Sequence, residues 1–317
     1  MKKIISALLS IILIMAIIPF NTFATDDFDI SDYTWEDIMS MSNSEYRELL
    51  TNFERIYDPF NTYQTDPLMG TQELPATPSI GGIQPYWTSG ETDMSETGSH
   101  ELITARACGV LLTDKGFWGE NHNSSILIAL TISLASILPD KYTIDFSGHF
   151  YDPDTGRNFV GSSLNTAYTN AIYYYNKAKN AYSPDEITDN FIEYVGRMLH
   201  YVQDASEPHH AANVTAGIIN NSHGQFENFA DTNLNSYIDG FTTIYSNYYS
   251  NALTYPDVGT IVYSTAKKAK DYITSVDNVN NKSQWSYVAN ITTRNAVESS
   301  ALALYKLSHD ADISLTK

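Results

Sequence analysis

The amino-acid sequence predicts an all-α protein with a single compact, multi-helix domain. Apolar residues recur at helical spacing over most of the chain after residue 100, while alternating strand patterns are scarce. The stretch over residues 200–213 reads His-Tyr-Val-Gln-Asp-Ala-Ser-Glu-Pro-His-His-Ala-Ala-Asn, with three imidazoles and two carboxylates. Such a set of nitrogen and oxygen ligands suits Zn²⁺, so a metal site is expected within the helical domain.

The first 24 residues have the pattern of a secretory signal peptide. A positive start at Lys2 and Lys3 precedes an apolar run over residues 4–20 and small residues up to Ala24. We therefore expect a secreted, extracellular protein. An uncleaved membrane anchor is the alternative, because the apolar run approaches the length that spans a bilayer. The single cysteine, Cys108, cannot form an intramolecular disulfide, which makes bound metal a candidate stabilising element.

Residues 25–86 form an acidic segment that we interpret as a pro-segment and linker. They carry 12 acidic and 2 basic residues, a net charge of −10 within a total of −19. Five prolines and the Gly81-Gly82 pair interrupt the second half, so only short helices over residues 35–56 are expected. Residues 87–317 suffice for one compact domain, and we expect a monomer. The acidic charge argues against nucleic acid as a partner.

Helical periodicity divides the region after residue 87 into successive helices. The expected helices span residues 100–112, 124–138, 165–181, 183–205, 225–246, 258–274 and 285–309. The second is apolar nearly all round, which is typical of a buried central helix, and it stops before Pro139. The fourth opens on Ser183-Pro184-Asp185-Glu186, with serine as N-cap, proline at the first helical position and glutamate placed for a capping box.

Histidines and carboxylates that suit a metal are dispersed along this domain. His200 and Asp204 are four residues apart and share one face of their helix, and His223 and Glu227 repeat that spacing. Farther upstream, Asp140 lies at a helix end, and His149 follows in a loop over residues 140–160. These groups exceed what one zinc needs, so the sequence predicts two or three metals close together. That arrangement clamps both the attacking and the leaving oxygen in phosphoryl transfer.

The central motif, His200-Tyr-x-x-Asp204-x-x-x-Pro208-x-His210-x-x-Asn213, resembles the signature of the bacterial zinc-dependent phospholipases C. This family includes the phosphatidylcholine-cleaving enzymes of bacilli and the catalytic domain of clostridial alpha-toxin. The resemblance extends over nearly all of residues 87–317, through His149-Phe-Tyr-Asp-Pro-Asp, His223-x-x-x-Glu227-Asn-Phe, and Trp87 thirteen residues before His100. It implies an all-α domain of the zinc-dependent phospholipase C and P1 nuclease type. It also implies cleavage of the glycerol-side phosphodiester of phospholipids to diacylglycerol and a phosphorylated head group.

The resemblance implies three zinc ions and a set of ligands for each. The first zinc would be surrounded by Asp140, His149, His200 and Asp204. The second would be held by His210, His223 and Glu227. The third would be bound by the α-amino group and carbonyl oxygen of Trp87, by His100 and by a bridging Asp204. Asp145 is the substitute for Asp140, whose spacing to His149 is shorter than in the family, and Asp140 is also the candidate general base.

The role of Trp87 predicts that the protein is made as a zymogen. An α-amino group binds metal only when it is free and deprotonated. While the bond between Tyr86 and Trp87 is intact, that nitrogen belongs to an amide and the third site is incomplete. We therefore expect activation by a protease that cleaves after Tyr86.

The head-group pocket is where the sequence departs from the family. The relatives bind choline through an acidic residue near the mature N-terminus and two aromatic residues, in keeping with cation–π recognition. Phe146 matches one aromatic position, whereas direct counting places Gly90 and Lys141 at the other two. A shift of one residue would supply Glu91 and Tyr142 instead. Without that shift the pocket is altered, and phosphatidylethanolamine or another lipid becomes a candidate substrate beside phosphatidylcholine.

Two other functions stay open. Zinc-dependent single-strand nucleases of the P1/S1 type resemble this fold and also use an N-terminal tryptophan, but their usual disulfides are absent here, and the context of Tyr201 and Asn213 favours the lipase. A non-catalytic, zinc-binding secreted protein would be favoured by loss of a ligand, and no ligand is evidently lost. The unmatched histidines, His122, His209 and His309, are interpreted as packed or exposed residues.

Overall fold

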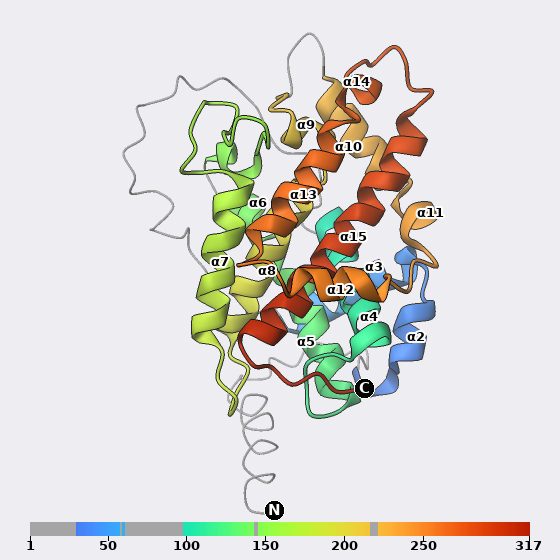
Figure 1. The fold of residues 1–317 in the computed structure, drawn as a ribbon. Coiled ribbons are helices and arrows are strands. Elements are labelled where there is room, and N and C mark those ends of the chain that lie inside the picture. Colours follow the sequence, from blue (N-terminus) through green and yellow to red (C-terminus); the bar gives the residue numbers. More distant parts are fainter. Residues whose placement is uncertain (1–29, 58, 61–97, 143–144, 216–220) are drawn as a thin grey trace, which may run out of the picture.

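The computed structural model describes residues 30–57, 59–60, 98–142, 145–215 and 221–317, and over these residues the protein is all-α (Figure 1). Within these ranges the extended segments pair only as isolated bridges, such as the one between Phe117 and Thr316. The predicted fold class is confirmed.

Four long helices make up the centre of the fold: α4 (Ser99–Lys115), α5 (His122–Ala135), α8 (Asp189–Asp204) and α15 (Trp285–Asp310). A fifth, α7 (Ala167–Ala181), packs along α8 (Figure 1). Most of α5 is buried, as its continuous apolar sequence predicts. The stretch His122–Lys141 has the length and apolarity of a membrane-spanning helix, but 67% of its window is buried inside the protein, so its place in the core accounts for its composition.

The other elements surround these helices. They are η1 (Ile30–Asp32), α2 (Trp35–Ser40), α3 (Asn43–Ile56), α6 (Leu138–Tyr142), η2 (Phe146–His149), α9 (Pro208–Ala211), α10 (Ser222–Thr232), α11 (Leu234–Ile238), α12 (Ser246–Ala252), α13 (Gly259–Lys270) and α14 (Ile273–Val276). In Figure 1, α9, α10 and α14 lie together at one end of the molecule, far from the C-terminus.

The predicted start of the fourth helix is wrong. Ser183 and Glu186 close a turn, in which the Glu186 amide donates to the Ser183 carbonyl at 3.3 Å. Helix α8 begins only after it, at Asp189, and its N-cap is Thr188, whose hydroxyl accepts a hydrogen bond from the Phe191 amide. The chain forms a turn here and not a helix N-cap, because serine and aspartate side chains can bond to backbone groups in both structures.

Two other predicted helices are broken. The region 225–246 contains α10, α11 and the first residue of α12 instead of one helix, and the region 258–274 contains α13 and the start of α14. Asn233 ends α10, because its side-chain amide and its backbone amide both donate to the Phe229 carbonyl. Gly240, with φ +74°, then turns the chain away after α11. Helical periodicity continued across these breaks, and the sequence pattern alone did not reveal them.

The helices expected over residues 35–56 are present as α2 and α3, and they pack on the face formed by α4 and α5. The Trp35 ring meets the Phe117 ring edge-on with a centroid distance of 6.0 Å, and the Trp35 amide donates to His122 Nε2 at 3.0 Å. Leu50 and Phe53 of α3 are buried in the same core. This part of the acidic segment therefore belongs to the hydrophobic core of the described protein.

A glycine lets α8 approach the end of α5. A Cβ on Gly196 would lie 2.4 Å from the Ala135 Cβ and 2.8 Å from the Ser136 amide nitrogen, far below a normal contact. At this separation the Ser136 carbonyl accepts a hydrogen bond from His200 Nδ1 at 2.8 Å. The close contact between the two helices therefore also sets the orientation of a histidine one turn later on α8.

We expect Gly196→Ala to destabilise the protein by about 1–3 kcal/mol, the range measured for added volume in packed cores. Alanine is intrinsically the better helix former by about 1 kcal/mol, so a loss of stability would identify the contact with Ala135 as the cause. Urea unfolding of the two proteins measures the difference. An unchanged or raised unfolding free energy would contradict the role assigned to this contact.

Candidate metal centre

Eight side chains that the sequence marks as metal ligands meet in one buried cluster. They come from six elements: His100 from α4, Asp140 from α6, His149 from η2, His200 and Asp204 from α8, His210 from α9, and His223 and Glu227 from α10. Each of these side chains is at most 2% exposed to solvent. Trp87, the ninth, lies outside the described residues, and so does Glu91.

The first group is formed by His149, His200 and Asp204, with Asp140 beside them. Asp204 Oδ2 lies 2.9 Å from His149 Nδ1 and 3.2 Å from His200 Nε2. Asp140 Oδ1 lies 3.5 Å from His149 Nδ1 and 3.4 Å from His200 Nε2. Two imidazole nitrogens and two carboxylates therefore converge on one point, with the spacing that a metal ion needs.

His100 joins this group from the other side. Its Nε2 lies 3.7 Å from Asp204 Oδ1 and 3.8 Å from Asp140 Oδ2. Its ring stacks on that of His200 with a centroid distance of 4.0 Å. His100, Asp140 and His200 form a second candidate ligand group, so both carboxylates can be shared between neighbouring ions.

A third group combines His210, His223 and Glu227 with a residue that the sequence reasoning missed, Glu207. Glu227 Oε1 lies 3.0 Å from His223 Nε2 and 3.4 Å from His210 Nε2. The other nitrogen of His210, Nδ1, faces Asp204 Oδ1 at 3.2 Å, which links this group to the first. A signal for Glu207 was present in the sequence, since an acidic residue directly before a proline is typical of a helix N-cap.

Local structure explains how the separate elements deliver these side chains. The spacing of four residues places His200 and Asp204 on one face of α8. Asp140 lies in the first turn of α6, which begins with Leu138-Pro139, where a proline costs no helical hydrogen bond. The loop after His149 is tied to α9, because the Tyr151 amide donates to the His210 carbonyl at 3.1 Å.

Outer hydrogen bonds hold two of the imidazoles in place. His200 donates through Nδ1 to the Ser136 carbonyl, which leaves Nε2 facing the carboxylates. His100 Nδ1 is 2.7 Å from the side-chain oxygen of Gln203, whose amide nitrogen donates in turn to the Thr104 hydroxyl. Partners of this kind set the tautomer and ring orientation of metal-binding histidines.

The two central carboxylates have opposite pKa shifts. Burial raises the pKa of Asp140 to about 8, against the opposing effect of the His149 imidazole. Burial also disfavours ionised Asp204, but His200 and His149 outweigh it and lower its pKa below the ordinary value. The imidazoles alone therefore do not supply enough positive charge for both carboxylates to ionise. A divalent cation seated between them would do so.

The polar atoms in the cluster fit a cation. Both oxygens of Asp140, Oδ1 of Asp204 and both nitrogens of His210 are buried without a hydrogen-bond partner in the described part of the chain. Such atoms are costly in a dry interior unless a partner satisfies them. A donor set of imidazoles and carboxylates without thiolates is the chemistry of hydrolytic zinc sites. The residues present therefore fit bound zinc.

The remaining sequence candidates are placed as follows. Asp145, the substitute for Asp140, is kept away from the cluster, because its oxygens accept hydrogen bonds from the Ser147 amide and from Asn165 Nδ2. Phe146 is half-buried with its ring 5.8 Å from that of His149. Tyr142 is the last residue of α6, and its side chain lies outside the described part of the structure.

The histidines expected to be packed or exposed differ from one another. His122 and His309 have exposed side chains, whereas His209 is fully buried beside the third group. His209 Nδ1 lies 2.7 Å from Glu207 Oε1, and its ring stacks on that of His223.

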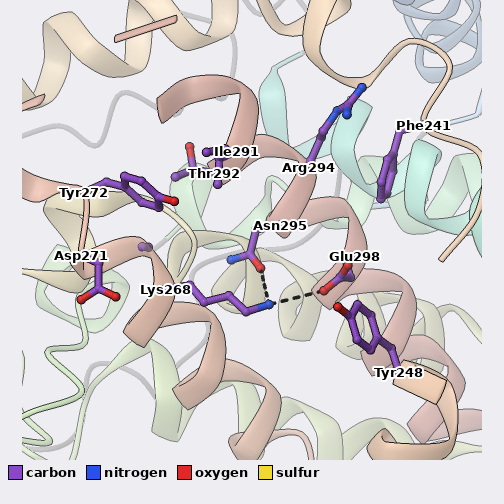
Figure 2. A pocket seen from close by; sticks show the side chains of 11 residues that line it. Phe241, Tyr248, Lys268, Asp271, Tyr272, Ile291, Thr292, Arg294, Asn295 and Glu298 are labelled. Carbon is purple, nitrogen blue, oxygen red and sulfur yellow. Dashed lines mark hydrogen bonds and ion pairs between the residues drawn. The ribbon is translucent and has the colours of Figure 1, made fainter. Parts of the chain in front are cut away.

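A separate hollow of about 370 Å³ lies against α13 and α15 (Figure 2). Lys268 reaches across it towards Asn295 and Glu298, with distances of 3.4 and 3.5 Å. Its lining shares no residue with the metal cluster. This hollow is therefore separate from the candidate metal centre.

Comparison with known proteins relates the cluster to a family. The family model that describes zinc dependent phospholipase C matches residues 100–294, the region that carries all eight clustered side chains. A phospholipase C of Clostridium perfringens is 30% identical over 245 residues, which cover 68% of this chain and 59% of that protein. A phospholipase C of Bacillus cereus is 27% identical over 163 residues, 49% of this chain and 57% of that protein. The chain thus spans less than two thirds of the length of these relatives.

Solved structures show the same fold. The alpha-toxin of Clostridium absonum superposes with a TM-score of 0.58 and 25% identity, over 68% of this chain and 64% of that one. The alpha-toxin of Clostridium perfringens from avian strain SWCP gives a TM-score of 0.55 and 28% identity over the same shares.

We expect Asp204→Asn to lower metal binding more than loss of a ligand to a single ion, such as Glu227→Gln. The Asp204 carboxylate faces imidazoles of all three groups, so its loss should exceed the roughly 10–100-fold that removal of an outer hydrogen bond costs. Metal content after dialysis against a weak chelator measures the effect. Asp145→Asn is the matched control and should bind metal as the wild type does. Equal losses for Asp204→Asn and Asp145→Asn would contradict the geometry.

Proposed function

The chain belongs to the zinc dependent phospholipase C family, whose model matches residues 100–294, and from this premise we propose a secreted zinc metallohydrolase that cleaves phospholipids. The bond cleaved is the glycerol-side phosphodiester, and the products are diacylglycerol and a phosphorylated head group. The observation that carries the proposal is the convergence of eight buried ligand side chains from six elements on one cluster.

The proposal assigns three zinc ions to this cluster. The first is held by Asp140, His149, His200 and Asp204, and the second by His210, His223 and Glu227. The third takes His100, a bridging Asp204 and the amino nitrogen and carbonyl oxygen of Trp87. Support comes from the unpartnered oxygens of Asp140 and from the position of His100, within 3.8 Å of both aspartates.

The chemistry divides between zinc and the residues of the chain. Bound zinc supplies a Lewis acid for phosphate oxygens and acidifies a water nucleophile. The outer hydrogen bonds of His200 and His100 keep their ligand nitrogens aimed at the cluster, and burial excludes bulk water. Asp140 is the candidate general base that the family resemblance implies, and its two buried oxygens face the cluster without a hydrogen-bond partner among the described residues.

Phosphatidylcholine or a lipid with another head group is the proposed substrate. Phe146 beside His149 offers an aromatic face at the edge of the cluster. Lys141 follows Asp140 and lies 4.0 Å from Glu54 of α3, so a cationic side chain occupies the position where the family places an aromatic ring. Glu91 and Tyr142 are the remaining pocket candidates. The cationic Lys141 at the position of an aromatic ring favours a head group other than choline.

The proposed zymogen is activated by a protease that cuts after Tyr86. The packing of α3 supports this arrangement, since α3 is attached beside two ligand-bearing helices. Arg47 Nη2 and the Ser99 hydroxyl both contact Asp231, at 3.2 and 2.7 Å, and Ser99 directly precedes His100. Glu54 pairs with Lys141, which directly follows Asp140. Helix α3 is therefore attached beside residues that lie next to His100 and Asp140.

We expect cleavage of the folded precursor before Trp87 to raise phospholipid hydrolysis and the zinc content together, from two ions per chain to about three. The physical reason is that the third site needs both the free amino nitrogen and the carbonyl oxygen of residue 87. A form cut one residue later, which starts at Thr88, is the matched control and should remain slow with two ions. A precursor that hydrolyses phospholipid as fast as the form starting at Trp87 would sink the zymogen proposal.

Release of phosphorylated head groups from a panel of pure phospholipids tests the main proposal. The zinc-loaded, activated protein should hydrolyse at least one lipid and leave single-stranded DNA uncut, whereas His210→Ala should lose activity with the second zinc. Cleavage of DNA in place of lipid would favour the P1/S1-type nuclease. A zinc-loaded protein that cleaves neither would favour the non-catalytic zinc-binding protein.

A further inference from the structure

Glu207 and His209 form a buried, hydrogen-bonded pair that the proposed ligand sets do not use. Both side chains are fully buried, and Glu207 Oε1 lies 2.7 Å from His209 Nδ1. Burial of a carboxylate is costly unless it is well paired, so the presence of a buried pair here needs an explanation. Its neighbours are His210 and His223, two of the proposed ligands of the second zinc.

Glu207 acts on His210 through the backbone. It is the N-cap of α9, and its Oε2 accepts a hydrogen bond from the His210 amide at 2.7 Å. Serine, threonine or asparagine would cap this helix equally well without burying a charge. The cap alone therefore does not explain why a carboxylate occupies this position.

His209 acts on His223 through ring packing. The two rings are parallel, with an interplanar angle of 4° and a centroid distance of 5.0 Å. The His210 and His223 rings meet at 82°, with a centroid distance of 4.9 Å. Because Glu207 holds His209 Nδ1, the plane of the His209 ring is set, and that plane in turn limits how His223 can rotate.

Both effects converge on Glu227 Oε1, which lies 3.0 Å from His223 Nε2 and 3.4 Å from His210 Nε2. Glu207 Oε2 is 3.9 Å from His223 Nε2, farther than the Glu227 oxygen, and it is already engaged by the His210 amide. The two glutamates therefore differ in role. Glu227 faces the ligand nitrogens directly, whereas Glu207 lies farther from His223 and binds the backbone of His210.

We propose that Glu207 and His209 together form a positioning pair for the second zinc site, holding His210 by its backbone and His223 by its ring without binding the metal. The inference rests on the proposed function, because it presumes zinc at His210, His223 and Glu227. It adds that these ligands depend on two residues outside the ligand set.

Metal binding by the full chain tests this pair without reference to lipid hydrolysis. Glu207→Gln keeps a carbonyl oxygen for the helix cap but removes the charge, and His209→Phe keeps a flat ring but removes Nδ1. Each variant should lower the affinity for one of the bound zinc ions by about 10–100-fold, the usual cost of losing a residue that hydrogen-bonds to a ligand. The double variant should bind zinc no less tightly than the single variants, because the Glu207–His209 pair is already lost in each single variant.

Competition with a chromophoric chelator gives the affinities, and the visible spectrum of the cobalt-loaded protein reports the ligand geometry. Glu193→Gln is the matched control. Glu193 is also buried and is paired at 2.7 Å, to Arg197 on α8, but it is not part of the candidate ligand groups. Its loss should lower the unfolding temperature and leave zinc affinity and the cobalt spectrum unchanged.

The outcomes are distinct. If Glu207→Gln and His209→Phe both bind zinc as the wild type does, the positioning pair is overturned and the proposed function stands. If only Glu207→Gln weakens binding, Glu207 is itself a ligand or acts only as a cap, which also overturns the pair. If the wild-type chain binds no zinc, the proposed function fails and this inference fails with it.

Discussion

The contacts of the Asp204 carboxylate are the interaction on which the rest of the structure depends. One oxygen faces His149 and His200, and the other faces His210 and His100, so imidazoles from four elements meet at a single side chain. Burial opposes a charge there, yet the neighbouring imidazoles hold its pKa below the ordinary value. A buried carboxylate of this kind needs hydrogen-bond donors or a cation beside it. His100 supplies no charge, because burial lowers its pKa to about 3.

The helical core meets this requirement through a few close contacts. Gly196 allows α8 to approach α5, and the Ser136 carbonyl at the end of α5 then orients His200. On the opposite side, Gln203 orients His100 from α8 itself. Helix α8 therefore supplies ligands and also the groups that orient its neighbour's ligand. A small displacement of this one helix would disturb several metal contacts at once.

Much of the architecture follows from local pattern, and its failures have local causes. The long α15 and the buried α5 were predictable from sequence, because their apolar residues recur without interruption and no tertiary contact is needed to recognise that pattern. The start of α8 and the break after α10 were not, because Ser183 and Asn233 can satisfy backbone groups in a turn as well as in a helix. The core position of α2 and α3 could not be predicted either, because these helices belong to an acidic segment whose second half is rich in proline and resembles a linker.

The sequence by itself determined the all-α class and the pairs His200/Asp204 and His223/Glu227, because a spacing of four residues places both members on one helix face wherever the helix lies. Only the tertiary structure decided which distant residues join them. Asp140 faces the cluster and Asp145 does not, and Glu207 lies against His209 and His210. These residues stand at helix ends and turns, where the direction of a side chain depends on packing between elements and not on local spacing.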